Sequence, residues 1–348
     1  MMSNKFTPIS KIGEFELISR ILKDSSNKHK STKKGTGDDS AVIEHFAKKD
    51  CLISTDMLAE GVHFDPTYTP LKHLGYKSII VNISDICAMN GIATHALVSL
   101  GIPNKYSVEH IEELYSGIHT ACKNYSIDLI GGDTTSSASG LIISVTIIGE
   151  PSSTDLSYRS GAQPNDVVFV SGDLGGAYLG LQILEREKQI FMEDQKSQPE
   201  LTQYSTILEK QLKPEARVDI IRELRKLRIT PSAMIDLSDG LSSDLRHICK
   251  ASGVGVKIFE NKIPVAEETS EVASELNISP LFCALHGGED YEILFTAPAT
   301  LHQKITKISS IKAVGHITSD KNKIELITSS EQTIDLSSEG WDPFLVKK

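Results

Sequence analysis

The pattern of apolar and polar positions predicts a chain built from strands and helices throughout. In the first half, Leu71–Asn90 has helical periodicity, and Ser107 is a favoured N-cap for a second amphipathic helix. Apolar runs of strand length occupy the rest of this half, at Ser40–Phe46, Cys51–Thr55, His95–Gly101, Ile127–Ile130 and Leu141–Ile148. The resulting order, β-β-α-β-α-β-β, predicts an α+β unit built on one sheet.

The second half predicts an α/β layered unit. A buried strand starts near Asp166, and a helix is expected from Gly176 to about Glu187, followed by a polar stretch. Pro214 suits the first turn of a helix that runs to about Leu227. A further strand and helix are expected at Ala233–Ile235 and Leu241–Lys250.

Proline, serine and glycine concentrate between Pro151 and Pro164, which predicts a boundary between domains covering residues 1–150 and 151–348. A chain of 348 residues suits two domains of ordinary size. Near the N-terminus, Glu14–Lys23 has helical spacing. The polar, lysine-bearing segment Asp24–Gly37 is expected to be a loop, whose role the sequence does not indicate.

Composition narrows the function classes. With 39% hydrophobic and 24% charged residues, the chain has the make-up of a globular protein. Its net charge of −10 argues against nucleic acid as the main partner, and so acidic a protein would need metal cations to handle phosphates. The N-terminal segment lacks an apolar signal core and no membrane-length apolar run occurs, so we expect a cytoplasmic protein. Its five scattered cysteines, never in C-x-x-C spacing, are expected to be reduced and buried.

Aspartates recur beside glycines and small hydroxyl residues. Asp56, Asp133 and Asp236 stand where apolar strands are expected to end, which is where open α/β sheets place ligands. Further aspartates precede a predicted strand, lie on the Leu71–Asn90 helix or fall within DLSDGL: Asp38, Asp39, Asp85 and Asp239. Each one alone has a simpler explanation, because aspartate is favoured in turns and helix caps and is often merely exposed.

Taken together, the aspartates favour a metal site for phosphates. Several carboxylates in one cleft would repel each other unless cations held them, and Mg²⁺ bound through carboxylates and phosphate oxygens suits such a set. The Cys and His spacings of zinc sites are absent, and so are the Walker pattern G-x-x-x-x-G-K-[ST] and the kinase catalytic-loop motifs. A nucleotide would therefore bind outside the common nucleotide-binding folds.

Eight separate motifs, in order, resemble the thiamine-monophosphate kinase family: GEFELI, GTGDDSAVI, STDMLAEGVHF, NISDICAMNG, LIGGDTT, RSGAQPNDVVFVSGDLGGAYLG, DLSDGLSSDL and GGEDYEILFT. The resemblance extends from Gly13 to about Phe344, and its departures at Thr36, Ser40 and Asn90 remove no carboxylate. It implies an aminoimidazole ribonucleotide synthetase-like architecture. An N-terminal α+β domain, which binds ATP and metal and dimerises, is followed by a C-terminal α/β domain that completes the active-site cleft.

The resemblance also implies a reaction, the ATP-dependent phosphorylation of thiamine monophosphate to thiamine diphosphate with several Mg²⁺ ions. Two dianionic groups must meet: at about 4 Å and an effective dielectric constant of about 20, each unit-charge pair costs roughly 4 kcal/mol, or on the order of 16 kcal/mol for four pairs. Metal ions can offset this repulsion, which suits direct in-line transfer without a general base. By the resemblance, the metal ligands are Asp39, Ser54, Thr55, Asp56, Asp85, Asp133, Asp236 and Asp239.

The same resemblance assigns the substrate contacts. ATP contacts are expected at Tyr115, Gly132, Asp133, Arg159 and Ser238, and thiamine-phosphate contacts at His63, Glu289 and Trp341. An aromatic ring and a carboxylate suit a flat cationic substrate, and an arginine fork suits phosphate oxygens. Alternatives stay open for four of these positions: Tyr115 can belong to the core, Arg159 can be a surface arginine, Trp341 can close the core, and Glu289 in GGED can belong to a simple turn.

Other activities fit this sequence less well. Selenophosphate synthetases carry a reactive Cys or selenocysteine near the N-terminus, and hydrogenase maturation proteins of this fold use a C-terminal cysteine. This chain has no cysteine before Cys51 and ends in FLVKK. A non-catalytic nucleotide-binding protein would tolerate the loss of some carboxylates, and all of them are present. A metal-dependent phosphohydrolase is disfavoured because histidine ligands are lacking.

Overall fold

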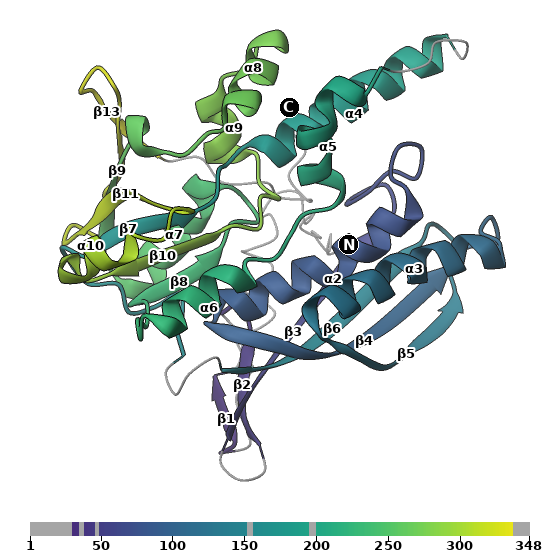
Figure 1. The fold of residues 1–348 in the computed structure, drawn as a ribbon, viewed down its shortest axis with the longest axis horizontal. Helices are drawn as coiled ribbons and strands as arrows, with labels where there is room; N and C mark the ends of the chain where they lie inside the picture. The colour runs from purple at the N-terminus through teal and green to yellow at the C-terminus, as the bar shows by residue number, and fades with distance from the viewer. Residues whose placement is uncertain (1–29, 35–37, 46–48, 152–155, 195–199, 337–348) are drawn as a thin grey trace, which may run out of the picture.

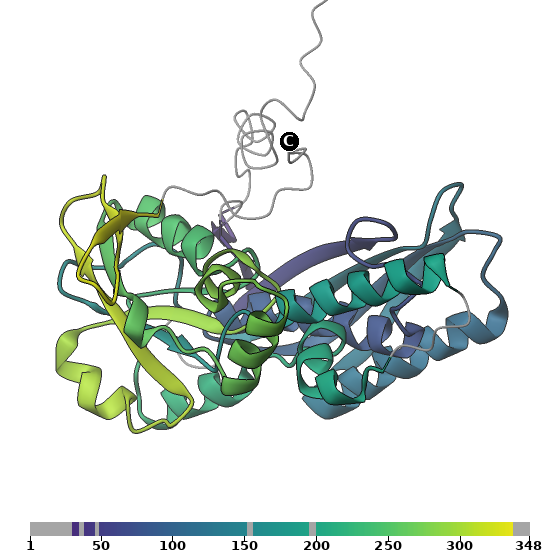
Figure 2. The same ribbon diagram turned by 90° about the horizontal axis from the view of Figure 1, so that it is seen from above.

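The computed structural model describes residues 30–34, 38–45, 49–151, 156–194 and 200–336, which form two sheets with helices packed against them (Figure 1). Seen from above, the two units lie side by side (Figure 2). The helix expected at Glu14–Lys23 lies outside the described residues. Among the residues described, no helix is both long and apolar enough to cross a membrane.

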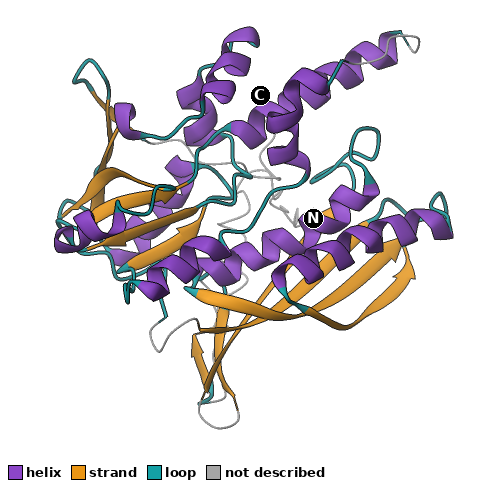
Figure 3. Ribbon diagram, viewed as in Figure 1, coloured by secondary structure: helices purple, strands orange, loops and turns teal. Residues whose placement is uncertain are grey.

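The N-terminal sheet has six strands in the order β1-β2-β3-β6-β4-β5, and only β4 and β5 pair in parallel. The strands are β1 (Thr32–Lys34), β2 (Ala41–His45), β3 (Lys49–Ala59), β4 (Gly91–Ile102), β5 (Asp128–Ser136) and β6 (Ile142–Pro151). Two helices, α2 (Leu71–Ala88) and α3 (Val108–Tyr125), lie on one side of this sheet (Figure 3). No described helix covers its other face.

Alternation along β6 explains this one-sided cover. Ile143, Val145 and Ile147 are buried in the same core as the apolar residues of α2, whereas Ser144 and Thr146 between them are partly exposed. Residues that pair directly across the sheet share a face, so the same alternation holds for the neighbouring strands β3 and β4.

The C-terminal sheet has seven strands in the order β13-β12-β9-β11-β7-β10-β8, and only β9 and β12 pair in parallel. The strands are β7 (Val167–Ser171), β8 (Ala233–Asp236), β9 (Gly255–Phe259), β10 (Ile293–Ala297), β11 (Ile311–Thr318), β12 (Ile324–Ile327) and β13 (Thr333–Asp335). The α-helices are α4 (Gly176–Glu193), α5 (Ser205–Leu212), α6 (Val218–Lys226), α7 (Leu241–Ser252), α8 (Glu267–Glu275), α9 (Pro280–His286) and α10 (His302–Ile305).

Helix α2 connects the two units. It contacts β3, β4 and β6 of the N-terminal sheet and also β8 and β10 of the C-terminal sheet. Its buried residue Ile83 belongs to one hydrophobic core with Phe169 of β7 and Phe295 of β10, whose rings stack with centroids 5.2 Å apart. Side chains on α2 can therefore meet residues from both halves of the chain.

The expected two-unit architecture is confirmed, and the second sheet is mainly antiparallel. Several element ends differ from the sequence prediction. The polar stretch after Glu187 continues α4, Pro214 precedes α6 instead of lying in its first turn, and α5 was not expected. Part of the expected loop Asp24–Gly37 forms β1, which pairs with β2. Backbone pairing and tertiary contacts support these segments although their side chains carry no clear periodicity.

Two aspartates also lie in places that the sequence did not predict. Asp56 is inside β3 and Asp133 is inside β5, so neither follows a strand end; Asp236, the last residue of β8, does. Strand β5 continues through the polar sequence GGDTTS because it is an edge strand, paired only with β4, and its side chains need not be buried.

Candidate active site

A cavity of about 920 Å³ lies between the two units. Its wall comes mainly from β3, the loop between β3 and α2, α2 and α4, with further residues from the turn between β8 and α7 and from the loop before β10. This volume falls within the range of small-molecule sites. The wall includes eleven of the residues expected from the sequence: Asp39, Ser54, Thr55, Asp56, His63, Asp85, Arg159, Asp236, Ser238, Asp239 and Glu289.

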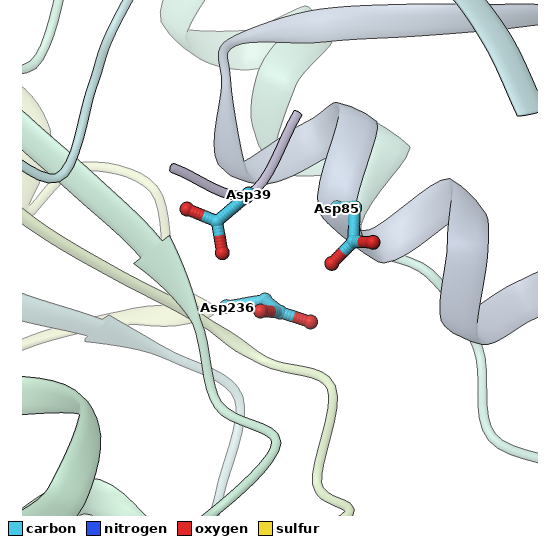
Figure 4. A group of neighbouring side chains, drawn as sticks. All are labelled: Asp39, Asp85 and Asp236. Carbon is cyan, nitrogen blue, oxygen red and sulfur yellow. The ribbon is translucent and has the colours of Figure 1, made fainter. Parts of the chain in front are cut away.

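Three carboxylates converge at one end of the cavity (Figure 4). Asp39 lies just before β2, Asp85 lies on α2 and Asp236 ends β8. One oxygen from each lies within 4.8 Å of the other two. We call this set the carboxylate cluster. It offers only hard oxygen ligands, which is the donor set that Mg²⁺ prefers.

Burial and mutual repulsion change the titration of these groups. Burial, followed by the charge of Asp39, raises the pKa of Asp236 to about 7. The same two causes raise the pKa of Asp56, which lies beside the cluster, to about 6. Burial also holds the pKa of Asp85 well above its usual range, and the charges of Asp56 and Asp236 add to the effect. Burial and the neighbouring carboxylates therefore both disfavour the charged forms of these aspartates when no cation is bound.

Arg159 is the cation that the chain itself places at the cluster. Its Nε donates to Oδ2 of Asp39 at 2.9 Å, and its Nη2 donates to Oδ1 at 2.7 Å. Burial nevertheless raises the pKa of Asp39, because it outweighs the favourable charge of Arg159. The arginine side chain is only 26% exposed, so it is part of the site and not a surface arginine. The guanidinium of Arg159, which was expected to contact ATP, instead binds the carboxylate of Asp39.

Serine hydroxyls add further contacts. The Ser84 hydroxyl donates to Asp236 at 2.6 Å, and the Ser54 hydroxyl donates to Asp85. Ser54 was expected at the site and Ser84 was not, although it directly precedes Asp85 in the chain. The Thr55 hydroxyl, in contrast, donates to the Val145 carbonyl at 2.9 Å on the opposite face of β3.

Helix α7 places another acidic residue, Asp244, behind the turn after β8, and the sequence did not predict a role for it. Asp239 lines the cavity, and its backbone N–H donates to Asp244 at 3.3 Å. Asp244 is buried in the first turn of α7, and burial followed by the charge of Asp239 raises its pKa well above the usual range. Its presence in the same motif, DLSDGLSSDL, was the available signal.

Asp133 lies away from this cavity. Asp133 of β5 pairs with Ser99 of β4. Ser99 pairs in turn with Ser144 of β6, which pairs with Met57 of β3. Three strand spacings of about 4.8 Å put Asp133 roughly 14 Å from β3. Because paired residues share a face, Asp133 points to the face without helices, whereas Asp56, next to Met57, points to the opposite face.

Gly132 and Tyr115 are likewise not among the described residues that line the cavity. A Cβ at Gly132 would collide with the Val98 carbonyl of β4, so this glycine permits a close approach between two strands. Tyr115 on α3 is partly buried against the N-terminal core, in agreement with the core alternative. Trp341 lies outside the described residues.

At the other end of the cavity, Glu289 is held from two sides. Nζ of Lys77 on α2 lies 2.9 Å from one carboxylate oxygen, and Nε2 of Gln211 on α5 donates to the other at 2.7 Å. His63, whose Nδ1 accepts the Ala59 N–H at 3.0 Å, also lines the cavity. Lys77 and Gln211 were not expected, because neither belongs to a motif that indicates chemistry.

Comparisons with known proteins agree with this geometry. The model of the AIR synthase related protein, N-terminal domain, matches residues 37–150, and that of the corresponding C-terminal domain matches residues 163–325. The thiamine-monophosphate kinase of Aquifex aeolicus is 37% identical over 291 residues, 83% of this chain and 87% of the relative. That of Bacillus subtilis is 34% identical over 343 residues, 95% of this chain and 99% of the relative.

A solved structure of AaThiL complexed with AMPPCP and TMP has a TM-score of 0.83 and 31% identity, and it covers 97% of this chain and 99% of that one. The similarity thus extends over both sheets and over the elements that form the cavity between them. The chain belongs to the thiamine-monophosphate kinase family, within the AIR synthase related proteins.

Proposed function

We propose that this chain transfers the γ-phosphoryl group of ATP to the phosphate of thiamine monophosphate, releasing ADP and thiamine diphosphate. The observation that carries the proposal is the convergence of Asp39, Asp85 and Asp236 inside a cavity of ligand size. The relative AaThiL, solved with AMPPCP and TMP, supports the choice of both substrates. Charge neutralisation and positioning are most of what phosphoryl transfer requires.

We further infer that Mg²⁺ binds at the carboxylate cluster. Asp39, Asp85 and Asp236 would hold it, with Ser54 and Asp56 beside them. The raised pKa values of Asp85 and Asp236 support this assignment, because burial and then repulsion from neighbouring carboxylates disfavour their charged forms, which a bound cation would stabilise. When bound, the ions would offset the repulsion between the two phosphates, on the order of 16 kcal/mol at close approach.

The state of His63 supports direct transfer without a general base. Because its Nδ1 accepts the Ala59 N–H, the neutral ring carries its proton on Nε2 and can only donate there. Burial lowers the pKa of His63, which favours that neutral form near pH 7. The acceptor phosphate has a second pKa of about 6 and needs no deprotonation. His63 is therefore assigned to substrate binding.

We also propose a homodimer formed through the face of the N-terminal sheet that no described helix covers. Apolar residues that share this face are only partly buried, and Met57 is 56% exposed. Asp133 points to the same face, so a second copy packed there could receive it. The cytoplasmic location and the domain boundary at residue 150 stay predictions.

The function is tested by incubating the purified protein with ATP, Mg²⁺ and thiamine monophosphate and separating the thiamine phosphates chromatographically. We expect thiamine diphosphate and ADP in equal amounts, and neither with the Asp85→Asn variant. ADP without thiamine diphosphate would point to a hydrolase instead. With γ-phosphate of ATP made chiral, one in-line displacement predicts inverted configuration; net retention would show a phosphoenzyme.

A further inference from the structure

We propose that Glu289 and Gln211 bind the amino group of the substrate's pyrimidine ring, and that Lys77 is the positioning residue that holds Glu289 for this contact. The inference rests on the proposed function and names the part of the substrate that the second end of the cavity binds. Lys77, Glu289 and Gln211 are called the acceptor site below.

The acceptor site lies far from the carboxylate cluster along α2. Leu74, Lys77, Val81 and Asp85 all line the cavity at helical spacing, so they form one stripe on this helix. Lys77 precedes Asp85 by eight residues, or about 12 Å of helix at 1.5 Å per residue. An elongated ligand whose phosphate reaches the cluster would therefore extend its rings toward Lys77.

Glu289 is fixed by both its side chain and its backbone. Lys77, whose side chain is 6% exposed, pairs with one carboxylate oxygen of Glu289 at 2.9 Å. It also donates to the backbone carbonyl of Gln211 at 3.1 Å. The Glu289 N–H donates to the Ser238 carbonyl at 2.8 Å. The residue has a φ of 58°, in the left-handed region, and such strain in a non-glycine residue persists where the surroundings hold it.

The orientation of the Gln211 amide follows from Glu289. An ionised carboxylate only accepts hydrogen bonds, so the amide NH₂ must face it, as the 2.7 Å contact requires. The amide oxygen Oε1 then points elsewhere, and it is buried without a hydrogen-bond partner. Gln211 as a whole is only 6% exposed and lines the cavity. A buried acceptor without a partner is costly, and a ligand donor would satisfy it.

The acceptor site thus offers hydrogen-bond acceptors, and the charge of Glu289 is balanced by that of Lys77. An ionised phosphate has no donor for the carboxylate and amide oxygens, whereas an exocyclic aromatic amine has two N–H donors. One can reach a free lone pair of the Glu289 carboxylate and the other Oε1 of Gln211. This chemistry orients thiamine monophosphate with its aminopyrimidine at Lys77 and its phosphate at the carboxylate cluster.

The test uses the full-length variants Gln211→Leu and Lys77→Met, with Lys213→Met as the control. Lys213 is two residues from Gln211 and pairs with Glu209 and Glu215 outside the cavity wall. For each protein, KM and kcat are measured with thiamine monophosphate and with an analogue in which oxygen replaces the pyrimidine amino group. Calorimetry without ATP gives the affinity for thiamine monophosphate, and thermal unfolding verifies folding.

We expect each cavity variant to raise KM for thiamine monophosphate about tenfold or more, with kcat and KM for ATP changed less than about threefold, as for a lost substrate hydrogen bond. Wild type should prefer the amino substrate over the analogue, and both variants should lose most of that preference. Unchanged preference in Gln211→Leu, or equal losses for ATP and thiamine monophosphate, would overturn the inference. A wild type that makes no thiamine diphosphate would overturn the proposed function itself.

Discussion

The two ends of the cavity differ in how well their charged side chains balance one another. At the carboxylate cluster, three aspartates, two of them buried and Asp85 half-buried, lie beside one guanidinium, which pairs with Asp39, and the pKa of each aspartate is raised. At the acceptor site, the single carboxylate of Glu289 meets one ammonium group and one amide. An unbalanced set of charges needs a cation from solution, whereas a balanced one can bind a ligand through hydrogen bonds alone.

The difference shows how one cavity can take a molecule with unlike ends. Helix α2 contributes Asp85 to one end and Lys77 to the other, so the distance between the ends depends on a single rigid element. The following predictions test whether the ends differ as described, beginning with the largest expected effect.

Removal of metal should abolish turnover, because the single guanidinium of Arg159 cannot balance the three carboxylates of the cluster. The raised pKa values of Asp56, about 6, and Asp236, about 7, mean that the folded metal-free protein binds more protons than the unfolded chain between about pH 4 and pH 7. These groups therefore make its stability fall as the pH rises through that window. Added Mg²⁺ should raise Tm more at pH 8 than at pH 5, because it competes with protons.

Scanning calorimetry with and without Mg²⁺ at the two pH values measures this effect, and an assay with chelator gives the turnover. Equal Mg²⁺ shifts at pH 5 and pH 8, or activity that survives chelation, would contradict the assignment of the cluster to metal.

The substitution Asp236→Asn should change activity and stability in opposite directions. Turnover should fall by about 100-fold or more, as for a lost metal ligand. The metal-free protein should unfold a few degrees higher, since like-charge repulsion at the cluster is relieved. Asp219→Asn is the control, because Asp219 lies outside the described cavity wall and pairs with Arg217, so its loss should leave turnover nearly unchanged and should not raise Tm. A lower Tm for the metal-free Asp236→Asn variant would show that the cluster is not under repulsive strain.

Mixing two inactive variants tests whether Asp133 contributes to the active site of a second copy of the chain. If Asp133 serves the cavity of a second copy, unfolding and refolding Asp133→Asn together with Asp236→Asn should restore about a quarter of the wild-type activity. Half of the dimers would be mixed, and one of their two sites would be intact. Refolded wild type calibrates the yield. If the refolded mixture recovers no activity, Asp133 either serves the cavity of its own chain or plays no part in the reaction. A protein that is a monomer by light scattering and is fully active would exclude the dimer.

His63→Ala should have the smallest effect. We expect KM for thiamine monophosphate to rise about tenfold at nearly constant kcat, because a neutral donor to the substrate is lost but no proton transfer depends on it. Steady-state kinetics at several pH values measures both constants. A fall in kcat that grows toward low pH in the wild type but not in the variant would instead indicate a general base.

The sequence was informative where short motifs carry the chemistry. It assigned Asp39, Asp85 and Asp236 to one site, although nearly 200 residues separate the first from the last, and the structure places all three in one cavity. It did not indicate Lys77 and Gln211. Lys77 interrupts an apolar helix pattern, and Gln211 lies in a polar segment whose helix was not expected. Their meeting depends on the packing of α5 near α2, which no local pattern reports.

Local patterns thus determined most elements of the first half, the two-unit fold and the acidic character of the site, because burial periodicity and turn chemistry act over a few neighbouring residues. Which face of a strand each side chain occupies was decided only by tertiary pairing. The pairing register across β5, β4, β6 and β3 places Asp133 and Asp56 on opposite faces of the sheet. The packing of α2 places Lys77 beside Glu289. A one-residue change of register would exchange those faces, so they depend on contacts between strands distant in sequence.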